Sequence, residues 1–343
     1  MGASETRMAQ ELQLAPQAVR DQAAGLAAPL AVLIGRLRRR PPQVVVTCAR
    51  GSSAHAATFG KFLIERHIGV PVAPAAPSIA SIYGRRLELD GQLLLAISQS
   101  GASDDLITLA KSARDSGALT VALVNAADSP LAQNCEIVLP MGAGPELSVA
   151  ATKTFIATLA ALLRLTAAWT QDRDIAAAID RLPDRLDAAG GLDWSQALDA
   201  FAGAPSLVTI GRGPTLAIAR EAALKFKETC NLHAEAFSGA EFLHGPVALV
   251  SNRYPILLFM PSDETATGLD RLAMDLRNKG TSLFVAEPGE PGLWRLPAVP
   301  ADHPDTDAIC LAQSFYAMAI RLADMRGTDV DRPRHLTKVT RTT

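Results

Sequence analysis

A segment near residue 45 recurs near residue 207, and this internal repeat limits what the chain can fold into. The first copy reads VVVTCARGSSAHAATFGKF from Val44, and the second reads SLVTIGRGPTLAIAREAAL from Ser206. Each has a β-branched run, a glycine turn and a helix-forming stretch, so we expect two α/β domains built on one plan. A single offset of 162 positions pairs Thr47 with Thr209, Arg50 with Arg212, Gly51 with Gly213, Ala57 with Ala219, Ser100 with Ser262, and Ser103 with Thr265.

The composition limits the partners that the chain can have. It has 343 residues, 48% of them hydrophobic, which is enough to build two cores of ordinary domain size. The 33 basic and 35 acidic residues nearly balance, so no strong field attracts nucleic acid or an anionic membrane surface. The longest apolar stretch, residues 155–163, is too short to span a bilayer. We therefore expect neither a nucleic-acid partner nor a membrane partner.

The cysteines indicate a reducing compartment. Their spacing contains no CxxC pair and no metal-ligand pattern, so we expect no metal and no disulfide framework. The amino terminus has no apolar core behind a basic start and therefore does not resemble a secretory signal. These features together predict a cytoplasmic protein with buried thiols at Cys48, Cys135, Cys230 and Cys310.

Strand and helix patterns alternate along both halves of the chain. Such alternation predicts two tandem, doubly wound parallel sheets, each in a three-layer α/β/α domain. We expect a helical segment over residues 1–32, a first domain over 33–170, a polar linker over 171–198, and a second domain with a tail over 199–343. The expected strands are Val44–Cys48, Pro71–Pro74, Gln92–Ser98, Thr120–Asn125, Glu136–Leu139, Ser206–Ile210, Pro255–Phe259 and Ser282–Val285.

The stretch LLLAISQSGASDD places hydroxyl groups where a buried strand ends and a helix begins. Ser98, Ser100 and Ser103 supply hydroxyls, Gln99 an amide, and Gly101 allows close approach to the backbone. At the carboxyl edge of a parallel sheet, together with the first helical N–H groups, these groups suit a phosphate monoester. Simple capping of the helix by one serine is the alternative interpretation, but capping needs only one hydroxyl.

A second small-residue turn, Gly51-Ser52-Ser53, follows the first strand of the same sheet. It is a weak signal when taken alone. The chain has neither the GxGxxG dinucleotide fingerprint nor the GxxxxGK[ST] loop of nucleotide triphosphatases. The phosphate is therefore expected on a sugar rather than on a nucleotide.

The second half carries groups that can move protons, in EAALKFKETCNLHAEAFSGAEFLHGPVALV. Glu221, Lys225 and Glu228 are three and four residues apart, so they share one face of a helix, and two histidine-containing segments follow. A solvent-exposed ion-paired face would show the same spacing. On spacing alone the catalytic and the structural interpretation both stay open.

Six motifs in one order give the chain a resemblance to a known family. They are ARGSSAHA, ISQSGASDD, ELSVAATKTF, EAALKFKETCNLHAEAF, LHGPVAL and GTDVDRPRHLTK. Together they resemble the sugar isomerase (SIS) family, and most closely the isomerase half of glucosamine-6-phosphate synthase, over nearly the whole sequence. The resemblance implies that the first domain binds the sugar phosphate, through Ser53, Ser98, Gln99, Ser100 and Ser103, with Val149 near the sugar.

The resemblance also implies roles for four catalytic residues. Glu228 would carry a proton between C1 and C2 of the open-chain sugar, with Lys225 assisting it. His244 would open the sugar ring from the partner subunit of a homodimer, and Lys338 would engage the open-chain carbonyl. These residue types suit the chemistry, since the proton transfer needs one base and ring opening needs a group that titrates near neutrality. No metal or cofactor is implied.

One departure from the synthase decides the expected reaction. That enzyme begins with a glutaminase domain, whereas this chain starts about forty residues before its first expected strand and has no cysteine before Cys48. Without an ammonia source, the site is expected to act as a glucosamine-6-phosphate deaminase that gives fructose 6-phosphate and ammonia. The alternatives are an aldose–ketose phosphosugar isomerase and a non-catalytic sugar-phosphate-binding regulator. A pure sensor would not need Glu228, Lys225, His244 and Lys338 together.

Overall fold

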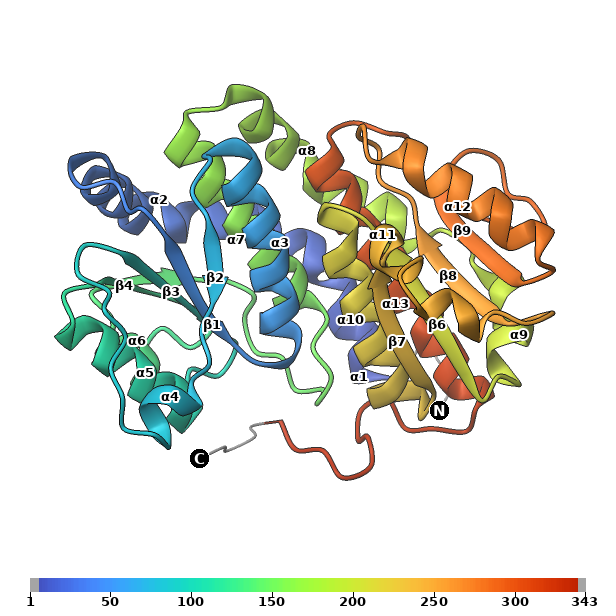
Figure 1. The fold of residues 1–343 in the computed structure, drawn as a ribbon, viewed down its shortest axis with the longest axis horizontal. Coiled ribbons are helices and arrows are strands. Elements are labelled where there is room, and N and C mark those ends of the chain that lie inside the picture. The colour runs from blue at the N-terminus through green and yellow to red at the C-terminus, as the bar shows by residue number, and fades with distance from the viewer. Residues whose placement is uncertain (1–5, 339–343) are drawn as a thin grey trace. The chain divides into compact units, whose positions relative to one another are not determined.

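Two compact units make up the chain in the computed structural model, which describes residues 6–338. The N-terminal unit contains residues 17–146, 153–179 and 337–338, and the C-terminal unit contains residues 6–16, 147–152 and 180–336. Each unit has one five-stranded parallel sheet with helices around it (Figure 1). The expected pair of α/β domains is therefore confirmed.

The sheet of the N-terminal unit is parallel throughout, in the order β2-β1-β3-β4-β5. Its central strand β3 is buried along its whole length, as expected for a sheet covered on both faces. The hydrophobic side chains of this sheet form a core with α5, including Leu94, Leu106 and Leu109. The strands are β1 (Val45–Ala49), β2 (Val72–Pro74), β3 (Leu93–Ser98), β4 (Leu119–Val124) and β5 (Ile137–Pro140).

Helices of this unit connect the strands and cover the sheet. The longest apolar helix, α7, packs on α3, where Gly60 leaves room for the side chain of Leu162. The stretch expected to be a linker is largely helical, since α8 runs from Arg173 to Gly190 with Pro183 inside it. The other helices are α2 (Ala15–Arg39), α3 (Gly51–His67), α4 (Ser78–Ser81), α5 (Asp104–Asp115), α6 (Pro130–Asn134) and α7 (Lys153–Thr170).

The sheet of the C-terminal unit repeats the first one. Its strands are parallel in the order β10-β9-β8-β6-β7, which is the same order read from the other edge. Two of its strands, β7 and β10, are absent from our sequence-based expectations. The strands are β6 (Ser206–Gly211), β7 (His233–Ser238), β8 (Pro255–Phe259), β9 (Ser282–Pro288) and β10 (Arg295–Ala298).

The helices of the C-terminal unit include the first and the last of the chain. Helix α1 packs on α13, and α10 packs on both α13 and the sheet. The helices are α1 (Arg7–Gln13), α9 (Leu198–Ala202), α10 (Pro214–Cys230), α11 (Gly239–Phe242), α12 (Ala266–Asn278) and α13 (Pro304–Met325), with short 3₁₀ turns at Ser195–Ala197 and Pro246–Leu249.

The two sheets share a feature that places ligands in folds of this kind. In each, the strand order reverses beside the first strand of the unit, β1 or β6, and the offset of 162 positions matches the first four strands of each unit to within two residues. Ligands of open parallel sheets bind at the carboxyl ends of the strands that flank such a reversal. In the N-terminal unit this location lies between β1 and β3.

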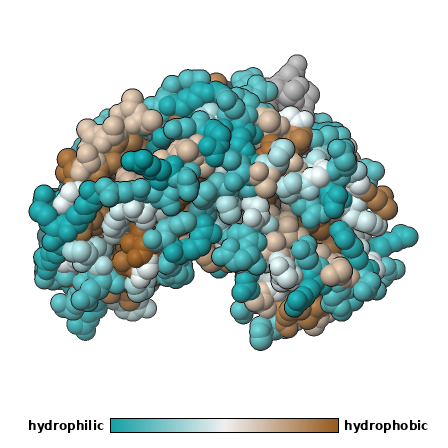
Figure 2. Space-filling view, turned by 90° about the horizontal axis from the view of Figure 1, so that it is seen from above, coloured by the Kyte–Doolittle hydropathy of each residue, from teal (hydrophilic) through white to brown (hydrophobic). Residues whose placement is uncertain are grey.

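The surface seen in Figure 2 is mostly hydrophilic. Hydrophilic residues cover most of the face seen in Figure 2, and hydrophobic residues gather there only in small groups. Among the described residues, no helix combines the length and the hydropathy that a membrane span requires.

Candidate active site

The loop between β3 and α5 has its hydroxyl groups at the carboxyl edge of the first sheet. The Ser98 hydroxyl accepts a hydrogen bond from the Gly101 N–H at 3.1 Å, and the Ser100 hydroxyl accepts one from the Ala102 N–H at 3.3 Å. Gln99 and Ser100 are half-buried. The loop is therefore preorganised by its own side chains, while its serines still reach solvent in part.

Ser103 occupies the N-cap position of α5, but it does not act as a simple cap. Its backbone is extended, as N-cap residues usually are, yet its side chain makes no capping hydrogen bond. Within the first turn of α5, the Leu106 N–H donates to the Asp105 carboxylate at 2.8 Å. Capping therefore does not explain this serine, and its contact with a phosphate stays a prediction.

Gly101 is required by the shape of the loop. Its φ angle is +61°, a region that side chains disfavour, and a Cβ atom there would lie 2.0 Å from the Ser129 hydroxyl. Its carbonyl accepts a hydrogen bond from the Leu131 N–H at 2.9 Å. The loop is thus fixed against the start of α6.

A second helix begins on the other side of the strand-order reversal. Helix α3 starts at Gly51, whose φ angle is +51°, and Ser53 lies in its first turn, half-buried. The start of α3 and the start of α5 thus flank the same reversal, so Ser53 and the β3–α5 serines share one edge of the N-terminal sheet.

An ion pair that the sequence did not predict joins these two loops. Arg50 donates from Nε and Nη2 to one carboxylate oxygen of Asp105, at 3.1 and 2.7 Å. The Asp105 side chain is 1% exposed, whereas that of Arg50 is 52% exposed. Arg50 directly follows β1 and is the N-cap residue of α3, while Asp105 lies in the first turn of α5. The ion pair therefore links the starts of these two helices, and the Arg50 guanidinium places a positive charge beside them.

Glu221, Lys225 and Glu228 contact one another on α10 in the C-terminal unit. Lys225 is 1% exposed and lies between two carboxylates, with Glu221 at 3.4 Å and Glu228 in closer contact. Glu221 also accepts a hydrogen bond from the Tyr316 hydroxyl at 3.0 Å and is itself buried. The Glu228 side chain is 21% exposed. The cluster is therefore not a solvated surface face, and Glu228 is its most accessible member.

The protonation of Lys225 follows from these neighbours. Burial by itself lowers the pKa of the ammonium, but the carboxylates of Glu221 and Glu228 more than reverse this, so the pKa is raised above its ordinary value. Lys225 is therefore a fixed cation at neutral pH. It can hold and orient Glu228, but it cannot itself serve as a base or as a neutral amine nucleophile.

A polar cavity of about 270 Å³ opens beside Glu228 within the C-terminal unit. It is lined by the end of α10 and by the segment after α13, which contributes Arg326, Arg332 and Arg334. Arg326 is structural, since its Nε donates to the Cys230 carbonyl at 2.8 Å and its Nη1 to the Ala202 carbonyl at 2.6 Å. The cavity beside Glu228 is thus lined by both signs of charge, from the exposed Arg332 and Arg334 and from Glu228 and Asp329.

The C-terminal segment GTDVDRPRHLTK, which ends at Lys338, is held by contacts of its own side chains. The Asp331 carboxylate accepts hydrogen bonds from the first N–H groups of α1, at Arg7 and Met8, both at 2.9 Å. Lys338 itself pairs with Glu146 at 3.0 Å, in the N-terminal unit. The Glu146 carboxylate also accepts hydrogen bonds from the Thr154 N–H and hydroxyl. Glu146 therefore caps α7 and pairs with the lysine of the tail.

The segment that carries Val149 is fixed by a residue of α1. The Glu11 carboxylate accepts hydrogen bonds from the Leu147 N–H and from the Ser148 N–H and hydroxyl, the last at 2.7 Å. Glu11 is 7% exposed, and Val149 is half-buried. This contact could not be predicted from the sequence, since Glu11 and Ser148 are 137 positions apart in the chain.

His244 is exposed on the turn that follows α11. Its N–H donates to the Glu241 carbonyl at 3.0 Å, and no hydrogen bond joins it to Glu228 within the described part of the chain. The structure therefore brings Lys225 to Glu228, but it does not bring His244 to this carboxylate within one copy. Over residues 6–338, no cluster of three or more His, Cys, Asp or Glu side chains is arranged to hold a metal ion.

The equivalent loop of the C-terminal sheet is closed by its own carboxylates. Ser262 and Thr265, which correspond to Ser100 and Ser103, donate in close contact to Asp307 and Asp263. The two hydroxyl groups that would donate to a phosphate therefore already donate to carboxylate oxygens. Only the N-terminal copy of the repeat keeps an open set of hydroxyls.

All four cysteines are buried free thiols, as expected. Burial raises the pKa of Cys230 to about 11, and those of Cys135 and Cys310 to about 12. They therefore stay protonated at neutral pH and do not serve as nucleophiles.

The relatives of the chain include aminotransferases of sugar phosphates. It is 33% identical over 314 residues to the glutamine–fructose-6-phosphate aminotransferase (isomerizing) of Zymomonas mobilis, covering 86% of this chain and 51% of that protein. The chain spans about half the length of the curated relatives that it matches first.

Two solved structures share the fold over at least 95% of this chain. A proposed phosphosugar isomerase from Silicibacter pomeroyi is 44% identical, with a TM-score of 0.90 and coverage of 95% of this chain and 100% of the other. The glucosamine-6-phosphate deaminase of Thermotoga maritima matches with a TM-score of 0.72 over 96% and 99% of the two chains, at 21% identity, which establishes the shared fold alone.

The SIS domain family matches both halves of the chain, over residues 41–168 and 200–286. These two stretches contain eight of the ten strands in full, and they cover more than half of the chain. Two parallel sheets of one strand order, a hydroxyl-lined loop on the first and this double match lead to one conclusion: the chain belongs to the SIS domain family.

Proposed function

We propose that this chain is an enzyme that converts glucosamine 6-phosphate and water into fructose 6-phosphate and ammonia. The observation that carries the proposal is the Glu221–Lys225–Glu228 cluster, a buried fixed cation that holds one partly exposed carboxylate beside a polar cavity. Its relatives include enzymes named for fructose 6-phosphate chemistry, which supports a substrate of this class.

The proton transfer is assigned to Glu228. In the open-chain aldose, its carboxylate takes the proton from C2 and returns it to C1, while the amine loses one proton and O1 gains one, so that C1 bears a hydroxyl and an imine is left at C2. Water then adds at C2 and ammonia leaves, giving the ketose. The Lys225 ammonium keeps Glu228 in place and offsets its charge. In this proposal Lys338, whose ammonium pairs with Glu146, engages the open-chain carbonyl.

The phosphate is assigned to the serine loop of the N-terminal unit. The hydroxyls of Ser53, Ser98, Ser100 and Ser103, the amide of Gln99 and the N–H groups that open α5 would hold its oxygens. Val149 would contact the sugar. Anchoring the phosphate and moving the proton are separate tasks, so variants of the two groups should have different kinetic effects.

Ring opening is assigned to His244 of a second copy of the chain. His244 is exposed on the turn after α11, together with the exposed Leu243 and Leu249, and a homodimer would cover these side chains. In this arrangement the monomer lacks a group needed for the reaction. The proposal therefore includes a dimer whose copies share their active sites.

Product analysis tests the reaction directly. The purified chain is incubated with glucosamine 6-phosphate while ammonia and fructose 6-phosphate are measured together, and the two are expected to form in equal amounts. A ketose formed from a neutral aldose phosphate, with no ammonia from the amino sugar, would instead favour an aldose–ketose isomerase. Binding of either sugar without turnover would favour a regulator.

Replacing Glu228 separates the proton transfer from binding. Glu228→Gln is expected to lower kcat by at least about a hundredfold, because the amide cannot take up the proton, while sugar-phosphate binding changes by less than about threefold. The matched control is Glu290→Gln, an exposed glutamate of the β9–β10 loop, which should keep full activity. Full turnover by Glu228→Gln would show that another group carries the proton.

Replacing the serines should affect binding first. Ser100→Ala together with Ser103→Ala removes two donors to the phosphate and is expected to raise KM by about ten- to a hundredfold, with a smaller effect on kcat. Ser112→Ala, near the other end of the same helix, is the control. An unchanged KM in the double variant would place the phosphate elsewhere.

A further inference from the structure

Tyr316 is a buried residue of α13 whose hydroxyl reaches the cluster on α10. It is 0% exposed, its ring contacts that of Phe315 at 5.8 Å between centroids, and its hydroxyl donates to Glu221 Oε1 at 3.0 Å. Helices α10 and α13 pack on each other within the C-terminal unit. A buried tyrosine hydroxyl usually has a hydrogen-bond partner, and here the partner is a carboxylate that also pairs with Lys225. The hydrogen bond therefore connects α13 to the charges beside Glu228.

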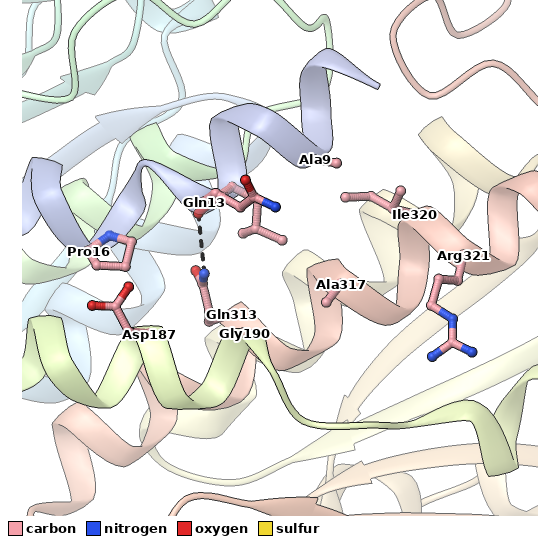
Figure 3. Close-up of a pocket in the computed structure, with 10 residues that line it drawn as sticks. Ala9, Gln13, Pro16, Asp187, Gly190, Gln313, Ala317, Ile320 and Arg321 are labelled. Atoms are coloured by element: carbon pink, nitrogen blue, oxygen red, sulfur yellow. Dashed lines mark hydrogen bonds between the residues drawn. The ribbon is translucent and has the colours of Figure 1, made fainter. Parts of the chain in front are cut away.

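The helix that carries Tyr316 is also fixed on the side of α1. Figure 3 shows Gln313, Ala317 and Ile320 of α13 on the wall of a cavity that α1 and α8 complete. The Gln313 Nε2 donates to the Leu12 carbonyl of α1 at 3.2 Å. Packing and hydrogen bonds thus hold α13 on two sides, and a side chain on a backbone held in this way keeps its partner in one place.

Tyr316 and Lys225 share one oxygen of Glu221. The hydroxyl lies 3.0 Å from Oε1 and the Lys225 ammonium lies 3.4 Å from the same atom. The ammonium is in closer contact with Oε2 of Glu228. Glu221 is 1% exposed, and a carboxylate buried to this extent needs strong partners. By satisfying part of this need, the hydroxyl leaves the ammonium nearer to the other carboxylate.

We propose that Tyr316 is a positioning residue for Glu228, because its hydroxyl keeps the Lys225 ammonium on that carboxylate. This role rests on the proposed function, in which Glu228 carries the proton. Tyr316 is not among the described residues that line the cavity beside Glu228, so it acts through its neighbours and not on the substrate. Without the hydroxyl, Glu221 depends more on Lys225, the ammonium moves toward it, and Glu228 is held less firmly.

Removing the hydroxyl alone tests this role. Tyr316→Phe is expected to lower kcat for glucosamine 6-phosphate by about five- to twentyfold and to change KM by less than about twofold, because the phosphate contacts are untouched. The matched control is Tyr254→Phe, which makes the same chemical change at a half-buried tyrosine of the same unit and should keep kcat within about twofold. An unchanged kcat in Tyr316→Phe, or a change confined to KM, would overturn the proposal.

A double-mutant cycle tests the path through Glu221. In Glu221→Gln the carboxylate that shares the ammonium is absent, so adding Tyr316→Phe should change kcat by less than about twofold. The same fold loss in both backgrounds would show that the hydroxyl acts independently of this carboxylate, which would also overturn the proposal.

Crystal structures of the full-length chain and of Tyr316→Phe separate this proposal from the proposed function, since they need no turnover. In the variant, the distance from Lys225 Nζ to Glu221 Oε1 is expected to fall from 3.4 Å to about 2.8 Å, while the contact with Glu228 lengthens. An unmoved ammonium would overturn the positioning role even if Glu221→Gln failed to fold. A moved ammonium in a chain whose wild type releases no ammonia would support the described coupling and overturn the proposed function alone.

Discussion

Two buried lysines of this chain differ in what surrounds them. Lys225 is 1% exposed and has two carboxylate partners, whereas Lys153, the first residue of α7, is 3% exposed and has no hydrogen bond or ion pair among the described residues. A buried charge is stable only when it is paired or reaches water. The two lysines therefore respond differently to removal of their charge.

Lys225→Met should strongly destabilise the C-terminal unit. It leaves Glu221 buried beside Tyr316 without its cation, which costs about 3–5 kcal/mol for a broken buried pair. Lys153→Met leaves no buried carboxylate without its cation and is expected to change the unfolding free energy by less than about 1 kcal/mol. Urea unfolding of the two variants measures both values. Equal destabilisation would mean that Lys225 is not paired as described.

The effect of Lys225 on stability should not depend on pH near neutrality. Its folded-state pKa lies above the ordinary value of 10.5, so its contribution is fully present below that value and is lost only as the pH rises through the folded-state pKa. The ionisation of Lys225 should therefore add no pH dependence to the unfolding free energy of the wild type from about pH 6 to about pH 9, which urea unfolding at several pH values measures. A steady decline over this range would indicate a lowered pKa instead.

At the scale of elements, two helix starts and two glycines shape the phosphate loop. Gly51 and Gly101 both have positive φ angles, but their surroundings differ. A Cβ atom at Gly51 would meet no atom within 4 Å, whereas one at Gly101 would lie 2.0 Å from the Ser129 hydroxyl. A side chain at Gly51 would therefore cause backbone strain alone, whereas one at Gly101 would cause both backbone strain and a steric clash.

Gly101→Ala should disrupt the loop, and Gly51→Ala should be tolerated better. Alanine at Gly51 meets only the cost of a left-handed conformation, about 1 kcal/mol, while at Gly101 it also displaces Ser129 and the start of α6. Sugar-phosphate affinity, followed by calorimetry, is expected to fall by at least about tenfold more in Gly101→Ala. Similar affinities in both variants would mean that the loop does not bind the phosphate.

At the scale of the whole molecule, the repeated strand order makes two phosphate loops conceivable in each chain. The second is filled by Asp263 and Asp307, which accept the hydroxyls of Thr265 and Ser262. We expect titration with fructose 6-phosphate to give one bound sugar per chain. Two bound sugars per chain would show that the acidic side chains move aside.

Much of the fold was predictable because it depends on local patterns. The β-branched runs and the offset between the copies predicted most strands to within two residues. Strand β7 was missed because HAEAFS lies at a sheet edge, with exposed and buried residues mixed, and its histidine and glutamate suggested chemistry instead. Strand β10 was missed because it has only four residues, one of them Pro297.

The contacts that build the site were less predictable, because they join residues that are far apart in the chain. The cluster on α10 follows from helical spacing, but its burial depends on Tyr316, 95 positions from Glu221. The pair of Arg50 with Asp105 and that of Lys338 with Glu146 leave no periodic signal in the sequence. Only the folded backbone brings them together.

The chain passes between its two units five times, since the described segments alternate from residues 6–16 to 337–338. No single cut in the gene can therefore yield two self-sufficient fragments. A piece ending after α8 would carry α1 away from α13, on which it packs, and would deprive Glu146 of its lysine partner. Although the strands repeat, each unit is therefore assembled from segments on both sides of any single cut, and we expect separately expressed halves to lose these contacts.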